Sequence, residues 1–241
     1  MFGTILAGAH ARGRGHQDAL RLVEQLALPG TRIAVTDAAS GAALVRAARS
    51  EGADLIVLPA GKGAPRVLHD VSLPVALVPA GYADVADERL RIIGTGFDGG
   101  PESRAALRLA ERLALEHGAT MRVCSVVPLV DWSSSRIDLS PAQYQARVRE
   151  SLGGRLNEEV QTLDDSVRAA ALVVKGDPAH VLADQSRQGI DLLVVGSRGQ
   201  GPIGRVLFGS VSSRLAESAG CPLLIVPRGA VPGEQTTAAA A

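Results

Sequence analysis

Short apolar runs alternate with longer segments of helical periodicity through most of the chain. The run at residues 91–95 precedes a stretch in which Leu107, Ala110, Leu113 and Ala114 fall on one helical face. The same order returns around "TMRVCSVV", "AAALVVKG", "IDLLVVG" and "PLLIVP", which are apolar at consecutive positions. Strands of this kind, separated by helices, are typical of a parallel sheet covered on both faces. The pattern therefore predicts an α/β fold.

Local signals mark where two of the helices begin. Ser140 followed by Pro141, and Asp177 followed by Pro178, are residues favoured at an N-cap and a first helical position. The helix that starts at Ser140 meets the glycine pair at 153–154, which is a candidate break in it. These signals predict the first residues of two helices, and they give only a candidate end for one of them.

The chain contains an internal repeat. "EGADLIVLPAGKG" at residues 51–63 matches "QGIDLLVVGSRGQG" at 188–201, and "LPVALVPAG" matches "CPLLIVPRG". The first copy lacks one strand and helix, the counterpart of residues 118–167, and much of what corresponds to "GPIGRVLFGSVSS". Repetition at this length indicates two related domains in tandem, with the first one shortened.

We therefore expect two open parallel-sheet, Rossmann-like α/β domains with helices on both faces. Residues 1–84 are expected to form the shortened domain, 85–90 a linker, and 91–229 a five-stranded domain. Residues 230–241 combine turn formers with small and polar residues, and we expect a flexible tail there.

Composition excludes several classes of partner. Lys and Arg total 25 against 25 Asp and Glu, so the chain has no basic field to hold nucleic acid or an anionic membrane. No apolar run is long enough to span a membrane, and the N-terminal residues do not match a signal peptide. Cys124 and Cys221 lie in apolar stretches typical of buried thiols, which favours a reducing cytoplasm. The histidines are scattered without metal-ligand spacing, so no metal site is expected.

The stretch "GSRGQGPIGRVLFGSVSS" at residues 196–213 contains two overlapping glycine patterns. Gly199, Gly201 and Gly204 have the spacing of a dinucleotide-binding turn. That turn normally follows the first strand of its domain, and an acidic residue after the next strand binds the ribose. Here it follows the penultimate strand, and the next one ends in Pro227 and Arg228. A nicotinamide-dependent oxidoreductase using residues 199–204 is therefore an alternative hypothesis.

The second pattern is longer and suits the expected architecture better. Nine residues separate Gly196 and Gly199 from Gly209 and Ser210 in this pattern, counted from Gly199 to Gly209. Glycine-containing turns thus flank residues 200–208, and the second turn opens a helix. Helix N-termini and exposed backbone N–H groups attract phosphate, and ligands gather at the carboxyl ends of parallel strands. This pattern predicts a phosphate site.

The second copy resembles a universal stress protein domain of the subfamily with the nucleotide motif G-x-x-G, nine residues, then G-[S/T]. The resemblance covers residues 91–228 and includes "GFDGGPESRAAL", "GDPAHVL", "DLLVVGSRG" and "GCPLLIVP". The whole chain is similar to a tandem universal stress protein, with the first domain matching only in outline. In that family the last strands pair, so "LPVALVP" and "CPLLIVP" are expected to cover each other within one chain, and two chains are expected to be able to associate.

The resemblance also implies which residues bind the nucleotide. Those on the base and ribose side are Gly96, Asp98, Val126, Val195 and Gly196. Gly199 allows the backbone to approach the nucleotide closely. The residues that hold the phosphates are Gly209, Ser210, Val211 and Ser212. Arg198 and Arg205 are our additions as charge partners for phosphate. Asp98 also has a simpler interpretation, because Asp is favoured in turns and at helix caps.

The implied function is a cytoplasmic, ATP-binding stress-response regulator, with Mg²⁺ as a companion of the nucleotide. "DGGPES" at residues 98–103 also resembles the first loop of ATP pyrophosphatases, S-G-G-x-D-S, but Asp98 stands where that loop has Ser and its carboxylate would repel a pyrophosphate. No nucleophile, general base or metal pair accompanies it, so no catalytic residue is assigned and slow ATP hydrolysis is the most that the family implies. An interaction module with a vestigial nucleotide site is the remaining alternative. The sequence does not identify a downstream protein partner.

Overall fold

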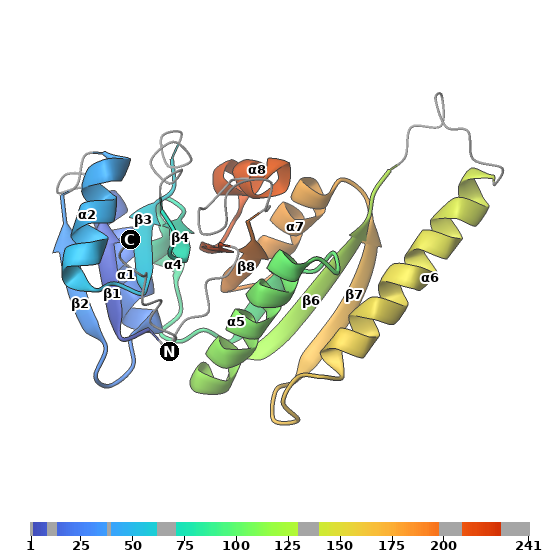
Figure 1. The fold of residues 1–241 in the computed structure, drawn as a ribbon, viewed down its shortest axis with the longest axis horizontal. Helices are drawn as coiled ribbons and strands as arrows, with labels where there is room; N and C mark the ends of the chain where they lie inside the picture. Colours follow the sequence, from blue (N-terminus) through green and yellow to red (C-terminus); the bar gives the residue numbers. More distant parts are fainter. Residues whose placement is uncertain are drawn as a thin grey trace, which may run out of the picture.

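The computed structural model describes residues 2–8, 14–37, 40–61, 71–129, 140–197 and 209–227. These residues build one sheet with helices on both sides (Figure 1). The strands are β1 (Thr4–Gly8), β2 (Arg32–Thr36), β3 (Leu55–Pro59), β4 (Val75–Val78), β5 (Ile92–Gly96), β6 (Thr120–Val127), β7 (Ala169–Lys175), β8 (Leu192–Gly196) and β9 (Leu223–Val226). The helices are α1 (Arg14–Leu26), α2 (Gly41–Glu51), α4 (Tyr82–Val85), α5 (Pro101–His117), α6 (Pro141–Val160), α7 (Pro178–Ser186) and α8 (Ser210–Ser218).

The sheet has nine strands in the order β2-β1-β3-β4-β9-β8-β5-β6-β7. Neighbouring strands are parallel except at the junction of β4 and β9, where Val75 lies opposite Ile225 and Leu77 opposite Leu223 in an antiparallel pair. The prediction of a mainly parallel α/β sheet is confirmed. So is the expectation that the strands of "LPVALVP" and "CPLLIVP" cover each other within one chain.

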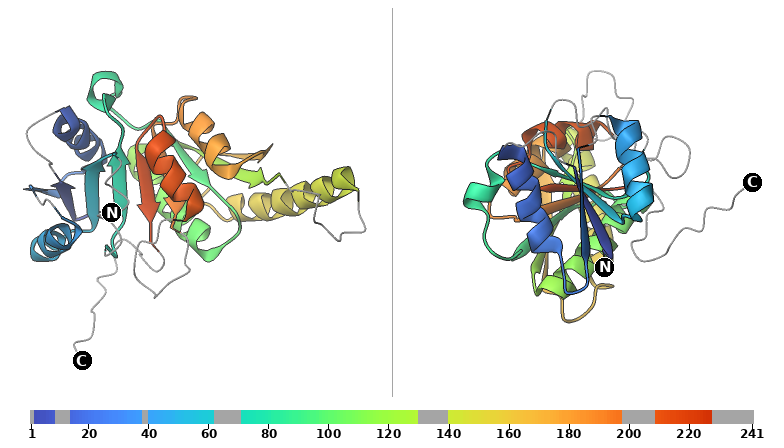
Figure 2. Two further views of the ribbon diagram at one scale, coloured as in Figure 1. Left: turned by 90° about the horizontal axis from the view of Figure 1, so that it is seen from above. Right: turned by 90° about the vertical axis from the view of Figure 1, so that its left-hand side faces the viewer.

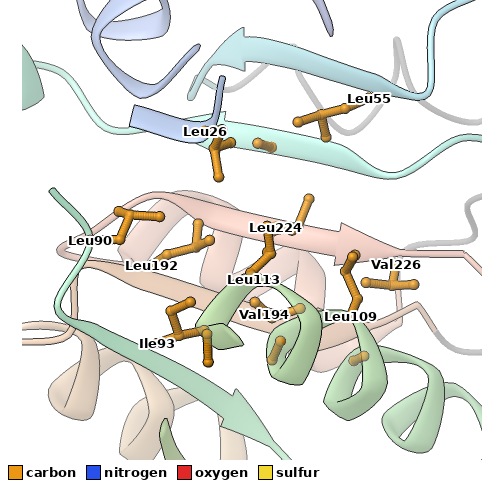
Figure 3. Packing of buried hydrophobic residues seen from close by; sticks show 14 of the residues in the cluster. Leu26, Leu55, Leu90, Ile93, Leu109, Leu113, Leu192, Val194, Leu224 and Val226 are labelled. Carbon is orange, nitrogen blue, oxygen red and sulfur yellow. The ribbon is translucent and has the colours of Figure 1, made fainter. Parts of the chain in front are cut away.

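Helices cover both faces of the sheet (Figure 2), as the runs of consecutive apolar residues predict. One buried cluster collects side chains from α1, α4, α5 and α6, and the other collects side chains from α2, α7 and α8. The first cluster continues across the β4–β9 junction. Leu26 and Leu55 from the half formed by β1–β4 belong to it together with Leu192 and Leu224 from the half formed by β5–β9 (Figure 3). One apolar core therefore joins the two halves.

The internal repeat is visible in one hydrogen-bonding arrangement. Asp54, just before β3, accepts hydrogen bonds at Oδ2 from the backbone N–H groups of Gly3 and Thr4, at 2.7 and 3.0 Å. Asp191, just before β8, accepts them from Arg91 and Ile92, at 2.7 and 2.8 Å. In each half, the carboxylate ties the start of one strand to the start of its neighbour.

The halves differ at their outer ends. In the second half β6 lies beside β5, and β7 lies outside β6. In the first half β2 lies beside β1 and ends the sheet, so the place equivalent to β7 holds no strand among the described residues. Ile33 and Val35 on β2 are 45% and 56% exposed. The sequence repeat places the missing strand at the counterpart of β6, whereas in the sheet β2 occupies that position and the position equivalent to β7 is empty among the described residues. The shortened half therefore has an open edge at β2.

The segment between the halves packs against α1. The buried carboxylate of Asp18 accepts hydrogen bonds from the backbone N–H groups of Gly81 and Ala83, at 3.0 and 2.8 Å. The Tyr82 hydroxyl donates to Gln25 Oε1 at 2.5 Å, and burial raises the pKa of Tyr82 far above its usual value. Leu90, the last residue of the expected linker at 85–90, is buried in the core. The connection is therefore fixed at both ends.

The helix that starts after Ser140 does not end at the glycine pair. Ser140 and Gln143 form a capping box, and α6 continues through residues 153–154 to Val160. Leu156, one turn beyond the pair, is fully buried in the core. Tertiary packing of this residue outweighs the weak helix propensity of two glycines, roughly 1 kcal/mol each.

Candidate functional site

A cavity opens at the carboxyl ends of β5, β6 and β8. It contains about 730 Å³ of space, solvent at its mouth included. The sequence-predicted residues that line it are Gly96, Asp98, Val126, Val195, Gly196, Gly209, Val211 and Ser212. Ser210 begins α8 directly beside them. Gly199 and the two suggested charge partners, Arg198 and Arg205, lie outside the described residues, as do Gly201 and Gly204 of the alternative pattern.

Two of the glycines lie at close contacts between elements. A Cβ added to Gly196 would stand 2.6 Å from both the carbonyl carbon and the carbonyl oxygen of Glu102, which are backbone atoms in the first turn of α5. A Cβ added to Gly96 would stand 2.9 Å from Leu182 Cδ1 on α7. Gly196 therefore lets β8 approach α5 closely, whether or not a ligand also approaches it.

Asp98 shapes the turn that leads into α5. Its Oδ1 accepts a hydrogen bond from the backbone N–H of Gly100 at 2.8 Å, across Gly99, whose φ of +82° favours glycine. Ser103 Oγ donates to the carbonyl of Gly100 at 2.9 Å. The turn interpretation of Asp98 is thus correct. It does not exclude a ligand contact, because Oδ2 has no hydrogen-bond partner among the described residues and the side chain is exposed at the cavity.

Two helices begin at the cavity without a side-chain cap. Gly209 is the N-cap of α8, and Gly100 is the N-cap of α5. Their first-turn N–H groups are available to an anion, and each helix dipole favours negative charge. The carboxylates of Asp98 and Glu102 lie at the α5 end of the cavity. An anionic group is therefore favoured at α8 and disfavoured at α5.

The N-terminus of α7, in contrast, is capped by a side chain. Asp177 accepts a hydrogen bond from the backbone N–H of His180 at 3.0 Å and forms an ion pair with Arg214 of α8 at 2.8 Å. The hydrogen bond from Arg214, with that from His180, lowers the pKa of Asp177. The N-terminus of α7 thus has its own internal carboxylate, and Arg214 ties α7 to α8.

Sequence reasoning missed several residues that line the cavity. They are Phe97, Glu102, Ser103, Cys124, Pro178, Leu182 and Ser197. Phe97, Cys124 and Ser197 neighbour a predicted residue along the chain or along the same strand, whereas the other four come from α5 and α7. Burial raises the pKa of Cys124 to about 11, so this thiol is protonated and unreactive at neutral pH.

Ser197 is the most informative of these residues. It is 1% exposed, and its Oγ has no hydrogen-bond partner in the described structure. Its backbone N–H donates to the carbonyl of Val226 at 2.8 Å, so its position at the end of β8 is fixed. A buried hydroxyl without a partner costs about 1–3 kcal/mol relative to a satisfied one. No signal in the sequence separates this serine from its neighbours.

The cavity continues into a groove along α6. The groove shares Asp98, Val126 and Pro178 with the cavity and extends to Tyr144 and Arg147. The cavity is therefore open on the side of Val126, at the end of β6.

Two of the equivalent positions in the first half carry larger residues. In the sequence repeat, Leu58 and Pro59 stand where Val195 and Gly196 stand in the second half. Leu58 packs directly on Gly8, and a Cβ added to Gly15 of α1 would be 3.1 Å from Pro59 Cβ. Pro59 also has no backbone N–H to donate.

Other kinds of site do not appear in the described ranges. These residues contain no group of three or more His, Cys, Asp or Glu side chains that could hold a metal ion. None of their helices is long and apolar enough to cross a membrane.

The fold and cavity define an α/β protein with a candidate ligand site at the carboxyl ends of parallel strands, beside an uncapped helix N-terminus. The model of the universal stress protein family matches residues 89–227. The chain therefore belongs to the universal stress protein family.

Relatives and solved structures agree with this membership. A universal stress protein from Mycolicibacterium smegmatis is 32% identical over 170 residues, which are 69% of this chain and 55% of that protein. The chain thus spans about half the length of this relative. The structure of a universal stress protein from Pseudomonas aeruginosa covers 93% of the chain, with 82% of its own residues matched, 16% identity and a TM-score of 0.59, which shows the shared fold. A further match, described as a universal stress protein in complex with cAMP, has 23% identity, a TM-score of 0.38 and coverage of 57% of this chain and 97% of its own.

Proposed function

We propose that this protein binds ATP in the cavity at the carboxyl ends of β5, β6 and β8 and acts as a stress-response regulator. The observation that carries the proposal is the convergence of residues distant in sequence, from Gly96 to Ser212, on one cavity next to the uncapped N-terminus of α8. An adenine nucleotide is also the ligand named for a solved member of the family.

The charges favour one orientation of the nucleotide. The phosphates lie at Gly209, Ser210 and Ser212, where backbone N–H groups face the cavity. The base and ribose lie toward Asp98 and Val126, away from the helix dipole of α8. Mg²⁺ accompanies the phosphates as part of the nucleotide complex. We assign no catalytic residue and propose a regulatory role, with slow ATP hydrolysis as the most that the family resemblance implies.

We propose further that the chain is a tandem of two universal stress domains, of which only the second binds nucleotide. The proposed domains are residues 1–84 and 91–229, joined by a linker at 85–90 and followed by a tail at 230–241. The matching roles of Asp54 and Asp191 support a common origin. Leu58 and Pro59, which stand at the positions of Val195 and Gly196 and pack on Gly8 and Gly15, support a degenerate first domain. We also place the protein in the cytoplasm and expect it to form a homodimer.

Calorimetry and thermal unfolding with Mg-ATP test the nucleotide site. ATP at about 100 times its dissociation constant should stabilise the wild type by about 2.7 kcal/mol, a rise of several degrees at roughly 2–4 °C per kcal/mol. Gly209→Val should abolish the shift, because the side chain occupies the space of the phosphates. Gly209 has φ −69° and ψ 166°, which Val adopts readily, so the variant should fold normally. The expected stoichiometry is one ATP per chain.

Gly201→Ala is the matched control. It should retain the ATP shift, because the dinucleotide pattern is not the one proposed to bind. A shift with NADPH that Gly201→Ala removes would favour the oxidoreductase. No shift with either nucleotide would favour the interaction module with a vestigial site.

A further inference from the structure

The free edge of β2 has an unusual combination of backbone and side-chain groups. Arg32 donates its backbone N–H to the carbonyl of Gly3 at 2.9 Å, toward β1. Because backbone groups alternate in direction along a strand, the N–H and C=O groups of Ile33 and Val35 point away from β1, to the open side. β2 is the last strand at this end of the sheet, with β1 as its neighbour, so those groups have no strand to pair with in the described structure.

The exposed side chains on this strand belong to the same two residues. Ala34 packs against the cluster covered by α2, so Ile33 and Val35 project to the opposite face. In the other half of the molecule that face is covered by α6, which contacts β6 and β7. The shortened repeat has lost this helix, and Ile33 and Val35 are consequently 45% and 56% exposed. A strand edge with exposed β-branched residues favours pairing with another chain.

We propose that β2 is a homodimer interface and pairs antiparallel with β2 of a second copy, about a two-fold axis through Ala34. In this register Ile33 of one copy lies opposite Val35 of the other. The two residues exchange both backbone hydrogen bonds, and their side chains lie side by side. Ala34 faces its own equivalent, and Arg32 faces Thr36. The strand is therefore self-complementary: its free N–H and C=O groups match, apolar residues meet, and no like charges are opposed.

A second copy suits this edge better than the opposite edge of the sheet. β7 exposes Ala170, Ala171 and Lys175, with α6 packed alongside. A contact between β2 and β7 would be heterologous and would extend into a filament, whereas a two-fold contact closes after two copies. The inference names the surface for the homodimer in the proposed function and does not depend on nucleotide binding.

A disulfide test examines the register directly. Opposed residues of a non-hydrogen-bonded antiparallel pair have Cα atoms about 4.5 Å apart, within the range of a disulfide of about 4.4–6.8 Å. Ala34→Cys in the full chain should therefore cross-link into a covalent dimer on mild oxidation. Thr36→Cys is the control, because it should face Arg32 of the second copy and stay monomeric on a denaturing gel. Cys124 and Cys221 are buried and should not compete.

A second experiment measures association without cysteines. Val35→Pro removes one outward N–H without removing a bond to β1, and Val35→Lys replaces the apolar contact with a charge. Both variants should be monomers in analytical ultracentrifugation, with the circular dichroism spectrum of the wild type. Val85→Lys changes an 81% exposed residue elsewhere and should remain a dimer like the wild type. A monomeric wild type across the concentration series, a dimeric Val35→Lys, or equal cross-linking at positions 34 and 36 would overturn the proposal.

Discussion

At the scale of single residues, the cavity contains a buried hydroxyl, that of Ser197, without a hydrogen-bond partner among the described residues. The backbone N–H of Ser197 donates to the carbonyl of Val226, which fixes the residue at the end of β8. Its Oγ nevertheless has no hydrogen-bond partner in the described part of the chain. A buried hydroxyl of this kind is explained most simply by a ligand or water that completes its hydrogen bond. Ser197 lies between the residues expected at the ribose and those expected at the phosphates, so the ribose–phosphate portion of the nucleotide is within its reach.

Ser197→Ala should therefore separate stability from binding. Removing the unsatisfied hydroxyl should leave the free protein as stable as the wild type or more so, because no hydrogen bond is lost. The same change should weaken ATP binding about 5- to 10-fold, the value of one net hydrogen bond. Urea unfolding and calorimetry measure the two effects on the same samples.

Ser186 provides the comparison. It is also buried, but its hydroxyl donates to the carbonyl of Ala183 at 2.6 Å and accepts from the N–H of Gly220 at 2.8 Å. Ser186→Ala should destabilise the protein and leave ATP affinity unchanged. If Ser197→Ala behaved in the same way, its hydroxyl would be structural and the ligand contact would be wrong.

At the scale of elements, the close packing of β8 on α5 positions the cavity. Gly196→Ala places a methyl group 2.6 Å from the backbone of Glu102, which a change of rotamer cannot relieve. We expect a loss of about 1–3 kcal/mol in the free energy of unfolding, typical of overpacking. Gly154→Ala, inside α6 with nothing within 4 Å of the new Cβ, should instead stabilise the protein by up to about 1 kcal/mol. Equal effects of the two changes in urea titrations would contradict this account of Gly196.

At the scale of the whole molecule, the β4–β9 junction makes the two halves one cooperative unit. Leu224 is fully buried on β9, opposite Ala76 of β4, in the cluster that spans both halves. Leu224→Ala should lower the free energy of unfolding by about 2–5 kcal/mol. Hydrogen exchange should lose protection by the same amount in peptides from β1 and from β5, since both strands depend on that core. Loss confined to β5 would mean that the halves unfold independently.

Much of the fold follows from signals that are local in sequence. Ser140 and Asp177 act as the N-caps their neighbours predict, and the apolar runs become strands that are mostly buried, except for β7 at the edge of the sheet. Several residues of the candidate site were also predictable. Gly96, Val126 and Gly196 come together because the carboxyl ends of parallel strands share one edge of the sheet.

The sequence by itself determined the α/β class, the helix starts, the unequal repeat and the group of residues around the cavity, because caps, periodicity and strand direction act over short distances. Only the tertiary structure decided that Gly196 touches the backbone of Glu102, that Leu58 packs on Gly8 in the first half, that Ser197 has no partner among the described residues, and that Ile33 is exposed. Each of these depends on which distant atoms become neighbours. That is set when the whole sheet closes around its cores, and no spacing along the chain encodes it.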